Sequence, residues 1–218
     1  MVDITINVVD EAESIDLITL DEAKTMMGIT TTDSDAQLQM MIDQASATIA
    51  RLCNRVFAQE TCEERFRGVG SRRVFLSHWP VKEEDLTLVE APLGTALDTD
   101  QYELEQGSGK VSFLTNATVG SGDDPAWPEP VRILYTGGYL LPDDAPLPLK
   151  QACVLLVREA KIQMSVLQTA GIRMIAHKES RVMFYDPNAA LKAGGIALGT
   201  GQQNTLDALL GRYIRYEC

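Results

Sequence analysis

Histidine and cysteine, which supply many metal ligands and nucleophiles, are scarce in this chain of 218 residues. The sequence contains two histidines and four cysteines, and Cys53, Cys62, Cys153 and Cys218 show no CxxC spacing. Metal clusters and redox motifs depend on closely spaced ligands. The sequence therefore predicts no metal site and no cofactor. Cys53 and Cys153 fall within helical apolar patterns, which favours small core residues.

Long hydrophobic runs are also missing. No apolar segment approaches the roughly 20 residues that a membrane-spanning helix requires, and no secretory signal pattern follows Met1. Hydrophobic residues nevertheless make up 45% of the chain. A chain of this size buries about 70% of its unfolded surface, so a core is available. We expect a soluble protein that is made in a reducing cytoplasm and binds no membrane.

Basic residues are too few to balance the acidic ones. The chain has 31 Asp and Glu against 19 Lys and Arg, for a formal charge of -12. Tight wrapping of nucleic acid needs Lys and Arg to displace counterions from phosphate, so this class of protein is disfavoured. A wall that DNA slides past would instead be negative, because like charges repel. Acidic clusters at 83–85, 123–124 and 143–144 fit such a wall, although solvated acidic surface is the more common reason for them.

Two helical segments precede a change of pattern near residue 57. Residues 1–18 alternate and then turn acidic, as in an N-terminal arm or edge strand. Thr19 and Glu22 fit a capping box at the start of a short helix that Gly28 would end. Apolar residues at spacings of three and four predict a second helix from 35 to about 54. Residues 19–56 are expected to form the first part of a helical core.

Residues 57–140 alternate over short segments separated by turn residues, which is typical of a sandwich or barrel. Gly107 and Gly109 stand where a hairpin turn between two strands favours positive φ. We interpret this stretch as an antiparallel β domain inserted into the helical core. Its predicted strands cover residues 64–66, 73–76, 86–89, 102–104, 110–113 and 131–135.

The chain then returns to helix. Residues 141–170 are predicted to hold a third helix, from 149 to about 167, that is apolar on two sides and hence central or covered by a neighbouring subunit. Residues 171–203 are predicted to form a hairpin, turning near 178–180, and a flexible linker rich in Gly and Ala. Residues 204–218 are predicted to be an apolar C-terminal docking segment. The expected fold class is α+β, with about four helices, the inserted β domain and this docking segment.

No segment carries a local signature of catalysis. His78 has no neighbours at metal-ligand spacing, and no GxSxG motif supports a serine nucleophile. Residues 194–201 are rich in Gly, but the Lys and Ser or Thr that follow the last Gly of a phosphate-binding loop are missing. A structural protein is favoured over an enzyme. The alternative is a carbohydrate- or receptor-binding β module of a virion that uses Trp79 or Trp127.

Several short segments recur in an order that is typical of one family. The strongest are VRILYTGGY at 131–139 and LKQA at 149–152. Others cover residues 17–24, 35–45, 54–57, 76–81, 102–104, 109–111 and 209–215. In this joint order the chain resembles the head-tail connectors, or adaptors, of tailed bacteriophages and of phage-like gene transfer agents.

This resemblance implies a structural protein that forms a ring between the portal and the tail and gives a conduit for DNA. The ring would be dodecameric. Its partners would be the portal protein and, on the tail side, a stopper or tail terminator protein. DNA would pass through without sequence-specific binding. The protein would lie in the neck of the virion, after assembly in the cytoplasm of the bacterial host.

Three surfaces are predicted to make the contacts of such a ring. Because the C-terminal segment of these adaptors commonly grips the portal, the resemblance implies portal binding by Leu206, Leu209, Leu210, Tyr213, Ile214 and Tyr216. The second apolar side of the third helix predicts a subunit interface at Val154, Leu155 and Val157. The acidic cluster Glu83, Glu84 and Asp85 is predicted to face the channel.

Overall fold

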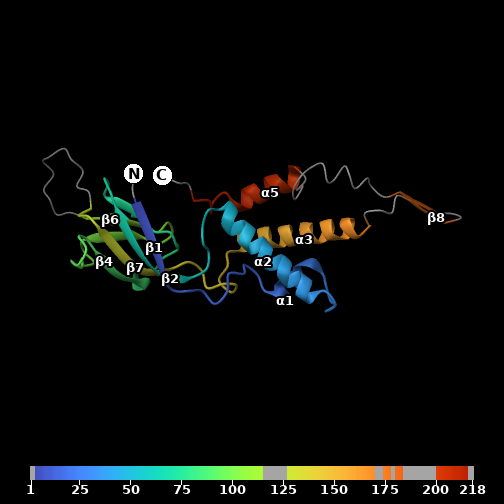
Figure 1. Cartoon of the computed structure of the whole chain (residues 1–218), viewed down its shortest axis with the longest axis horizontal. Helices are drawn as coiled ribbons and strands as arrows, with labels where there is room; N and C mark the ends of the chain where they lie inside the picture. Colours follow the sequence, from blue (N-terminus) through green and yellow to red (C-terminus); the bar gives the residue numbers. More distant parts are fainter. Residues whose placement is uncertain (1–2, 115–126, 170–173, 178–179, 184–199, 216–218) are drawn as a thin grey trace. The chain divides into compact units, whose positions relative to one another are not determined.

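Two compact units make up the protein in a computed structural model (Figure 1). The β unit comprises Met1–Ile15 and Asn54–Ala145, and the helical unit comprises Asp16–Cys53 and Pro146–Cys218. The predicted α+β class, a helical core with an inserted antiparallel β domain, is confirmed. The residues described are 3–114, 127–169, 174–177, 180–183 and 200–215.

The helical unit starts with the predicted capping box. The Thr19 hydroxyl accepts a hydrogen bond from the Glu22 amide, and the Glu22 carboxylate accepts one from the Thr19 amide at 3.0 Å. Two backbone donors that a helix start leaves without partners are thereby satisfied. The first helix, α1 (Leu20–Met27), ends at Gly28 with a left-handed φ of 68°. The short predicted helix and both of its ends are thus confirmed.

Helix α2 (Asp35–Leu52) packs against α3 (Leu147–Thr169), and α3 also packs against α5 (Thr200–Leu210) (Figure 1). Apolar residues of α2 at helical spacing are buried, as the pattern predicted: Leu38, Met41, Ile42, Ala45 and Ile49. The facing residues of α3 are Leu149, Ala152, Cys153, Leu156 and Val157, also buried. No helix in the described part of the chain is both long and apolar enough to cross a membrane.

The β unit contains two antiparallel sheets. The four-stranded sheet has the order β1-β2-β7-β4, with β1 (Asp3–Asp10), β2 (Glu60–Arg67), β7 (Val131–Gly137) and β4 (Leu86–Glu90). The three-stranded sheet has the order β3-β6-β5, with β3 (Arg73–Phe75), β6 (Lys110–Phe113) and β5 (Tyr102–Glu105). A short 3-10 helix, η1 (Glu83–Asp85), precedes β4. All six strands predicted for residues 57–140 are present, and residues 3–10 form the edge strand.

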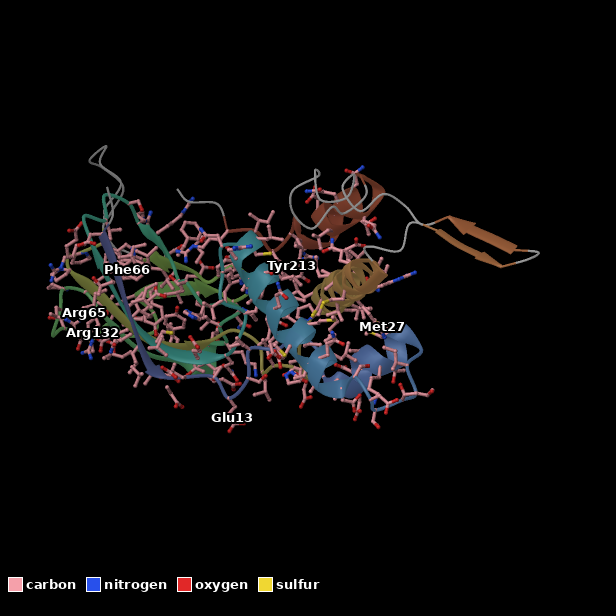
Figure 2. The ribbon with its side chains drawn as sticks, turned by 45° about the vertical axis from the view of Figure 1, so that its right-hand side comes forward. Glu13, Met27, Arg65, Phe66, Arg132 and Tyr213 are labelled. Carbon is pink, nitrogen blue, oxygen red and sulfur yellow. The ribbon has the colours of Figure 1, made fainter. Side chains whose placement is uncertain are left out.

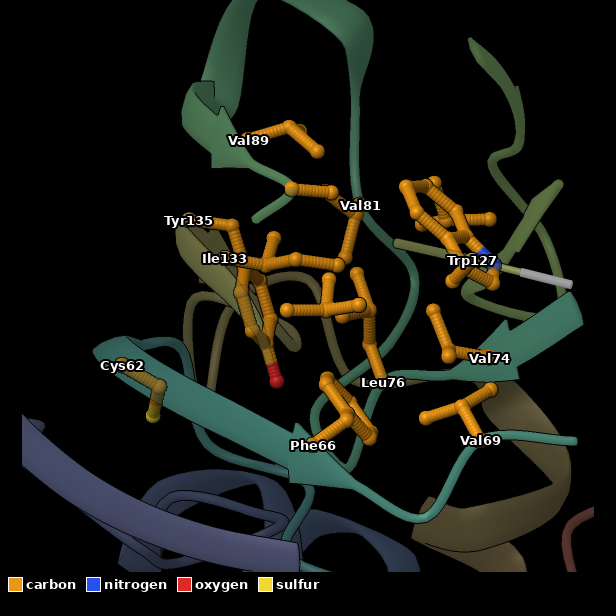
Figure 3. Packing of buried hydrophobic residues seen from close by; sticks show 13 residues of the cluster. Cys62, Phe66, Val69, Val74, Leu76, Val81, Val89, Trp127, Ile133 and Tyr135 are labelled. Atoms are coloured by element: carbon orange, nitrogen blue, oxygen red, sulfur yellow. The ribbon is translucent and has the colours of Figure 1, made fainter. Parts of the chain in front are cut away.

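The inner faces of these strands form the core of the β unit (Figure 3). Alternation along β7 buries Val131, Ile133 and Tyr135 and turns the intervening residues outward, as a period of two requires. Trp127 is only 2% exposed, and its ring lies 5.1 Å from that of Phe113. The core is therefore closed by aromatic residues from outside β7.

A predicted hairpin is also present, as β8 (Met174–His177) paired antiparallel with β9 (Ser180–Met183). One detail of the C-terminal prediction was wrong. Helix α5 (Thr200–Leu210) begins inside the predicted linker, because residues 200–203 carry no apolar periodicity that would mark a helix start. The helix ends at Leu210, and Gly211 follows it. The linker residues 186–199 lie outside the described residues.

The Gly137-Gly138 pair lets β7 pass against a neighbouring loop. Gly138 has a φ of 110°, and a Cβ there would lie 2.3 Å from the Ala58 carbonyl oxygen. Its amide donates to the Pro80 carbonyl at 3.0 Å, and the next amide, of Tyr139, donates to Phe57 at 2.8 Å. Only glycine satisfies both the backbone angle and the close approach.

We predict that Gly138→Ala lowers the free energy of unfolding by about 3 kcal/mol or more, since backbone strain and a steric clash add. Gly94→Ala is the matched control, because Gly94 also has a positive φ, 89°, but a Cβ there would meet nothing within 4 Å. Strain alone should cost that variant about 1–2 kcal/mol. Urea unfolding followed by circular dichroism measures both, and equal losses would contradict the steric argument.

Candidate functional site

A buried polar cluster lies on the inner face of β2. Glu60, Cys62 and Glu64 alternate along this strand, so their side chains point to one side. Cys62 and Glu64 are fully buried, at 0% exposure. Inward acidic residues are unusual in a strand, because a buried charge is costly unless it is hydrogen-bonded or paired. The cluster is therefore the first place to look for chemistry.

His78 lies between two of these side chains. Its Nε2 is 3.1 Å from a carboxylate oxygen of Glu60, and its Nδ1 is 3.5 Å from Sγ of Cys62. A thiol, an imidazole and a carboxylate in this order are also the parts of a cysteine nucleophile with its base. The sequence alone did not reveal this group, because His78 comes 16 residues after Cys62 and from a different segment.

The environment of Cys62 rules out a nucleophilic role. Burial, followed by the charges of the neighbouring Glu60 and Glu64 carboxylates, raises the pKa of its thiol to about 12. A reactive cysteine needs a lowered pKa and access to substrate, and Cys62 has neither. The thiol is protonated at neutral pH, and His78 is buried between Cys62 and Glu60 inside the β unit.

The same three residues form a group of potential metal ligands. One donor atom from each of Glu60, Cys62 and His78 lies within 4.8 Å of the others. A bound zinc ion would need these atoms to converge on one point at about 2.0–2.3 Å. However, Cys62 and Glu60 contact opposite nitrogens of the imidazole ring. One ion could not replace both contacts without turning the ring, so the geometry fits a hydrogen-bonded chain better than a metal centre.

Glu64 connects this cluster to β7. Its Oε1 accepts hydrogen bonds from the Tyr135 hydroxyl at 2.5 Å and from the Ser77 amide at 2.8 Å. The Tyr135 hydroxyl in turn accepts from the His78 amide at 3.0 Å. Burial, followed by the Glu64 charge, raises the pKa of Tyr135. Figure 3 shows the Tyr135 ring extending from β7 through the core toward β2, where this hydroxyl holds three segments together.

Of the two tryptophans in the alternative prediction, Trp127 is buried and Trp79 is half-buried against the core of the β unit. The Arg55 guanidinium lies 3.7 Å from the centroid of the Trp79 ring and donates to the Trp79 carbonyl. Trp127 is buried against Phe113. A sugar-binding platform needs an open aromatic face, so the structure does not support a carbohydrate-binding module on these residues.

The predicted subunit interface on α3 is smaller than expected. Val157 is fully buried within its own unit, so its assignment to the interface is corrected. Its side chain lies on the packed stripe with Cys153 and Leu156 because helical residues three and four apart share a face. Val154 and Leu155 are partly exposed and remain predicted residues of a subunit interface.

The predicted portal-binding residues divide in a similar way. Leu206 and Leu210 are buried where α5 packs, so neither offers free surface in this structure. Leu209, Tyr213 and Ile214 are partly exposed, and Tyr216 lies outside the described residues. The Arg215 amide donates to the Cys53 carbonyl at 2.8 Å, which ties the segment after α5 to the end of α2. In the predicted channel-facing cluster, Glu83 and Glu84 are exposed and Asp85 is partly exposed.

We predict that Tyr135→Phe lowers the free energy of unfolding by about 1–3 kcal/mol, because a buried carboxylate loses a donor and the His78 amide loses an acceptor. Tyr102→Phe is the control, as it removes a half-buried hydroxyl from the other sheet and should cost less than about 1 kcal/mol. Thermal and urea unfolding measure both variants. Similar losses would mean that the Glu64 contacts contribute little.

A family model described as head completion protein matches residues 16–161. Among solved structures, a chain from the neck of an empty GTA particle, computed with C6 symmetry, is similar with a TM-score of 0.55 and 15% identity, covering 98% of this chain and 97% of that chain. A chain from the virion of a native gene transfer agent (GTA) particle is similar with a TM-score of 0.50 and 16% identity, covering 98% of this chain and 96% of that chain.

These two likenesses concern the fold. No curated protein sequence matches the chain. The family match agrees with the resemblance to head-tail connectors that the order of short segments indicated. Because the family model covers more than half of the chain, the protein belongs to the head completion protein family.

Proposed function

We propose that the protein is a structural head-tail connector, an adaptor that forms a ring between the portal and the tail of a tailed phage or phage-like particle. The observation that carries this proposal is its membership of the head completion protein family over residues 16–161. Likeness of fold over 98% of the chain to a component of a GTA neck supports the same role. The protein would assemble in the host cytoplasm and remain in the neck of the virion.

The proposed ring is dodecameric. The six-fold symmetry applied to the similar neck is compatible with twelve copies, since twelve is a multiple of six. Each copy would present unlike faces to its two neighbours, a heterologous contact that closes by rotation. Val154 and Leu155 on α3 are the proposed subunit contacts on the helical unit, and Leu209, Tyr213 and Ile214 are the proposed portal contacts. A stopper or tail terminator protein would bind the tail side.

A structural role rather than catalysis is supported by the buried polar cluster. The titratable groups that sequence and structure single out, Cys62, Glu64 and His78, hold segments of the β unit together inside its core. Their burial leaves no room for a substrate at Cys62 or Glu64. DNA would pass through the ring without sequence-specific binding, because the chain carries a net charge of -12.

Disruption of the gene in the strain that makes the particle tests the proposal. We expect electron microscopy of the lysate to show separate heads and free tails, with joined particles restored when the intact gene is supplied in trans. Complementation with the Gly94→Ala variant should also restore joining, because Gly94 is exposed and the substitution leaves the core unchanged. Normally joined particles in the disrupted strain would refute the connector role.

We further propose that Glu83, Glu84 and Asp85 of η1 face the channel. Replacing all three by Lys would put positive charge on the path of DNA and should slow DNA ejection at low salt, because phosphate would be attracted. The control replaces Asp98, Asp100 and Asp143, exposed carboxylates elsewhere in the β unit, by Lys for the same change in net charge. Equal ejection kinetics in the two variants would contradict the proposal that η1 faces the channel.

A further inference from the structure

Strand β1 is an apolar sheet edge, and no strand of the described residues pairs with its outer side. It ends the order β1-β2-β7-β4, and each of its eight residues is exposed. Ile4, Ile6 and Val8 keep 39%, 45% and 39% of their surface accessible. A long, exposed, hydrophobic edge strand offers a row of backbone donors and acceptors to any strand that arrives. Such an edge is a pairing site unless something protects it.

The register of β1 shows that its apolar row continues the core face. Ile4, Ile6 and Val8 stand opposite Phe66, Glu64 and Cys62 of β2, whose side chains point inward. Cross-strand partners share a face. The core face of the sheet therefore extends past β2 to its edge.

The opposite face of the same strands is charged. Arg65 and Arg132 lie there side by side, as Figure 2 shows, and share Glu63 at 2.7 and 2.5 Å. Residues Thr5 and Asn7 of β1 belong to this charged face, since they stand opposite Arg65 and Glu63. An added strand would thus bury the apolar row of Ile4, Ile6 and Val8 on one face and meet mainly polar and charged residues on the other.

The other edge of the sheet, β4, is protected. The Leu97 amide donates to the Val89 carbonyl at 2.8 Å, and the Ala91 amide donates to the Thr95 carbonyl at 3.1 Å. A bridge joins Glu90 to Ala96. The chain thus folds residues 95–97 back over β4, whereas β1 has no such cover among the described residues.

The hairpin β8–β9 is a two-stranded sheet that would gain from joining a larger one, whereas β1 is a sheet edge that would accept another strand. It forms a two-stranded sheet and pairs with no other strand in the described residues. An isolated two-stranded hairpin is marginal in water and gains stability by joining a larger sheet. Its charge also complements β1. Arg181 lies in β9 and neither strand has an acidic residue, while β1 begins at Asp3, ends at Asp10 and has no basic residue.

We propose that the β8–β9 hairpin of one copy adds to the β1 edge of a second copy and extends its four-stranded sheet. Each copy would then give one hairpin and receive one, which is the heterologous contact that a closed ring requires. Pairing of β1 with β1 of another copy is disfavoured, because it would gather four Asp carboxylates. The inference deepens the proposed ring by naming a contact between its subunits.

The test is cross-linking, in cells of the particle-producing strain, of two variants that each carry one new cysteine at the proposed contact. One copy carries Ile6→Cys and the other Val182→Cys, each with Cys218→Ser and a different epitope tag. The remaining cysteines, Cys53, Cys62 and Cys153, are buried. A short, membrane-permeable bismaleimide is added, and a species that carries both tags can arise only between two copies. We expect this species at least tenfold above the level seen when either cysteine is absent.

The control pairs Val182→Cys with Thr87→Cys on the protected strand β4, an exposed position that should give only the background level. Absence of the 6–182 species, or a level equal to that of the 87–182 pair, would overturn the proposal. A dominant 6–6 species would replace it by pairing between β1 strands. The result is independent of head-tail joining: a 6–182 species together with normally joined particles in the disrupted strain would refute the connector role and leave this contact standing.

Discussion

The β unit depends on a buried carboxylate. Glu64 has no exposed surface, and its oxygen accepts from the Tyr135 hydroxyl and the Ser77 amide. These hydrogen bonds connect β2, β7 and the segment after β3 at one carboxylate. Desolvating a carboxylate is expensive unless such donors surround it, and the loss of one donor leaves the remaining charge poorly solvated. A network of this kind specifies one arrangement of the strands more sharply than apolar packing does.

Regular periodicity made most of the fold predictable. The spacing of Leu38 to Ile49 identified the buried face of α2, and the Thr19 to Glu22 pattern identified a cap, because both signals are local. Six strands followed from alternation and turn residues for the same reason. The start of α5 was missed because Thr200 to Gln203 are poor in apolar residues and so show no helical periodicity.

The candidate site was harder to predict, because its members meet only after folding. His78, Cys62 and Tyr135 come from three segments, and the only local hint was acidic residues at alternate, inward positions of β2. Likewise, Val157 could not be separated from Val154 and Leu155 by sequence, because all three are apolar. Only the packing of α2 on α3 shows which side of the helix its own unit covers.

Burial protects the thiols of Cys53, Cys62 and Cys153 from oxidation. Burial raises the pKa of Cys153 in the helical unit to about 12, as it does for Cys62 in the β unit. Oxidants attack exposed thiolates, and neither unit presents one at these positions. A particle released by lysis moves from a reducing cell interior to an aerated medium, where accessible thiols acquire disulfides or sulfenic acids. The three cysteines among the described residues, Cys53, Cys62 and Cys153, would keep their reduced thiols on both sides of that passage.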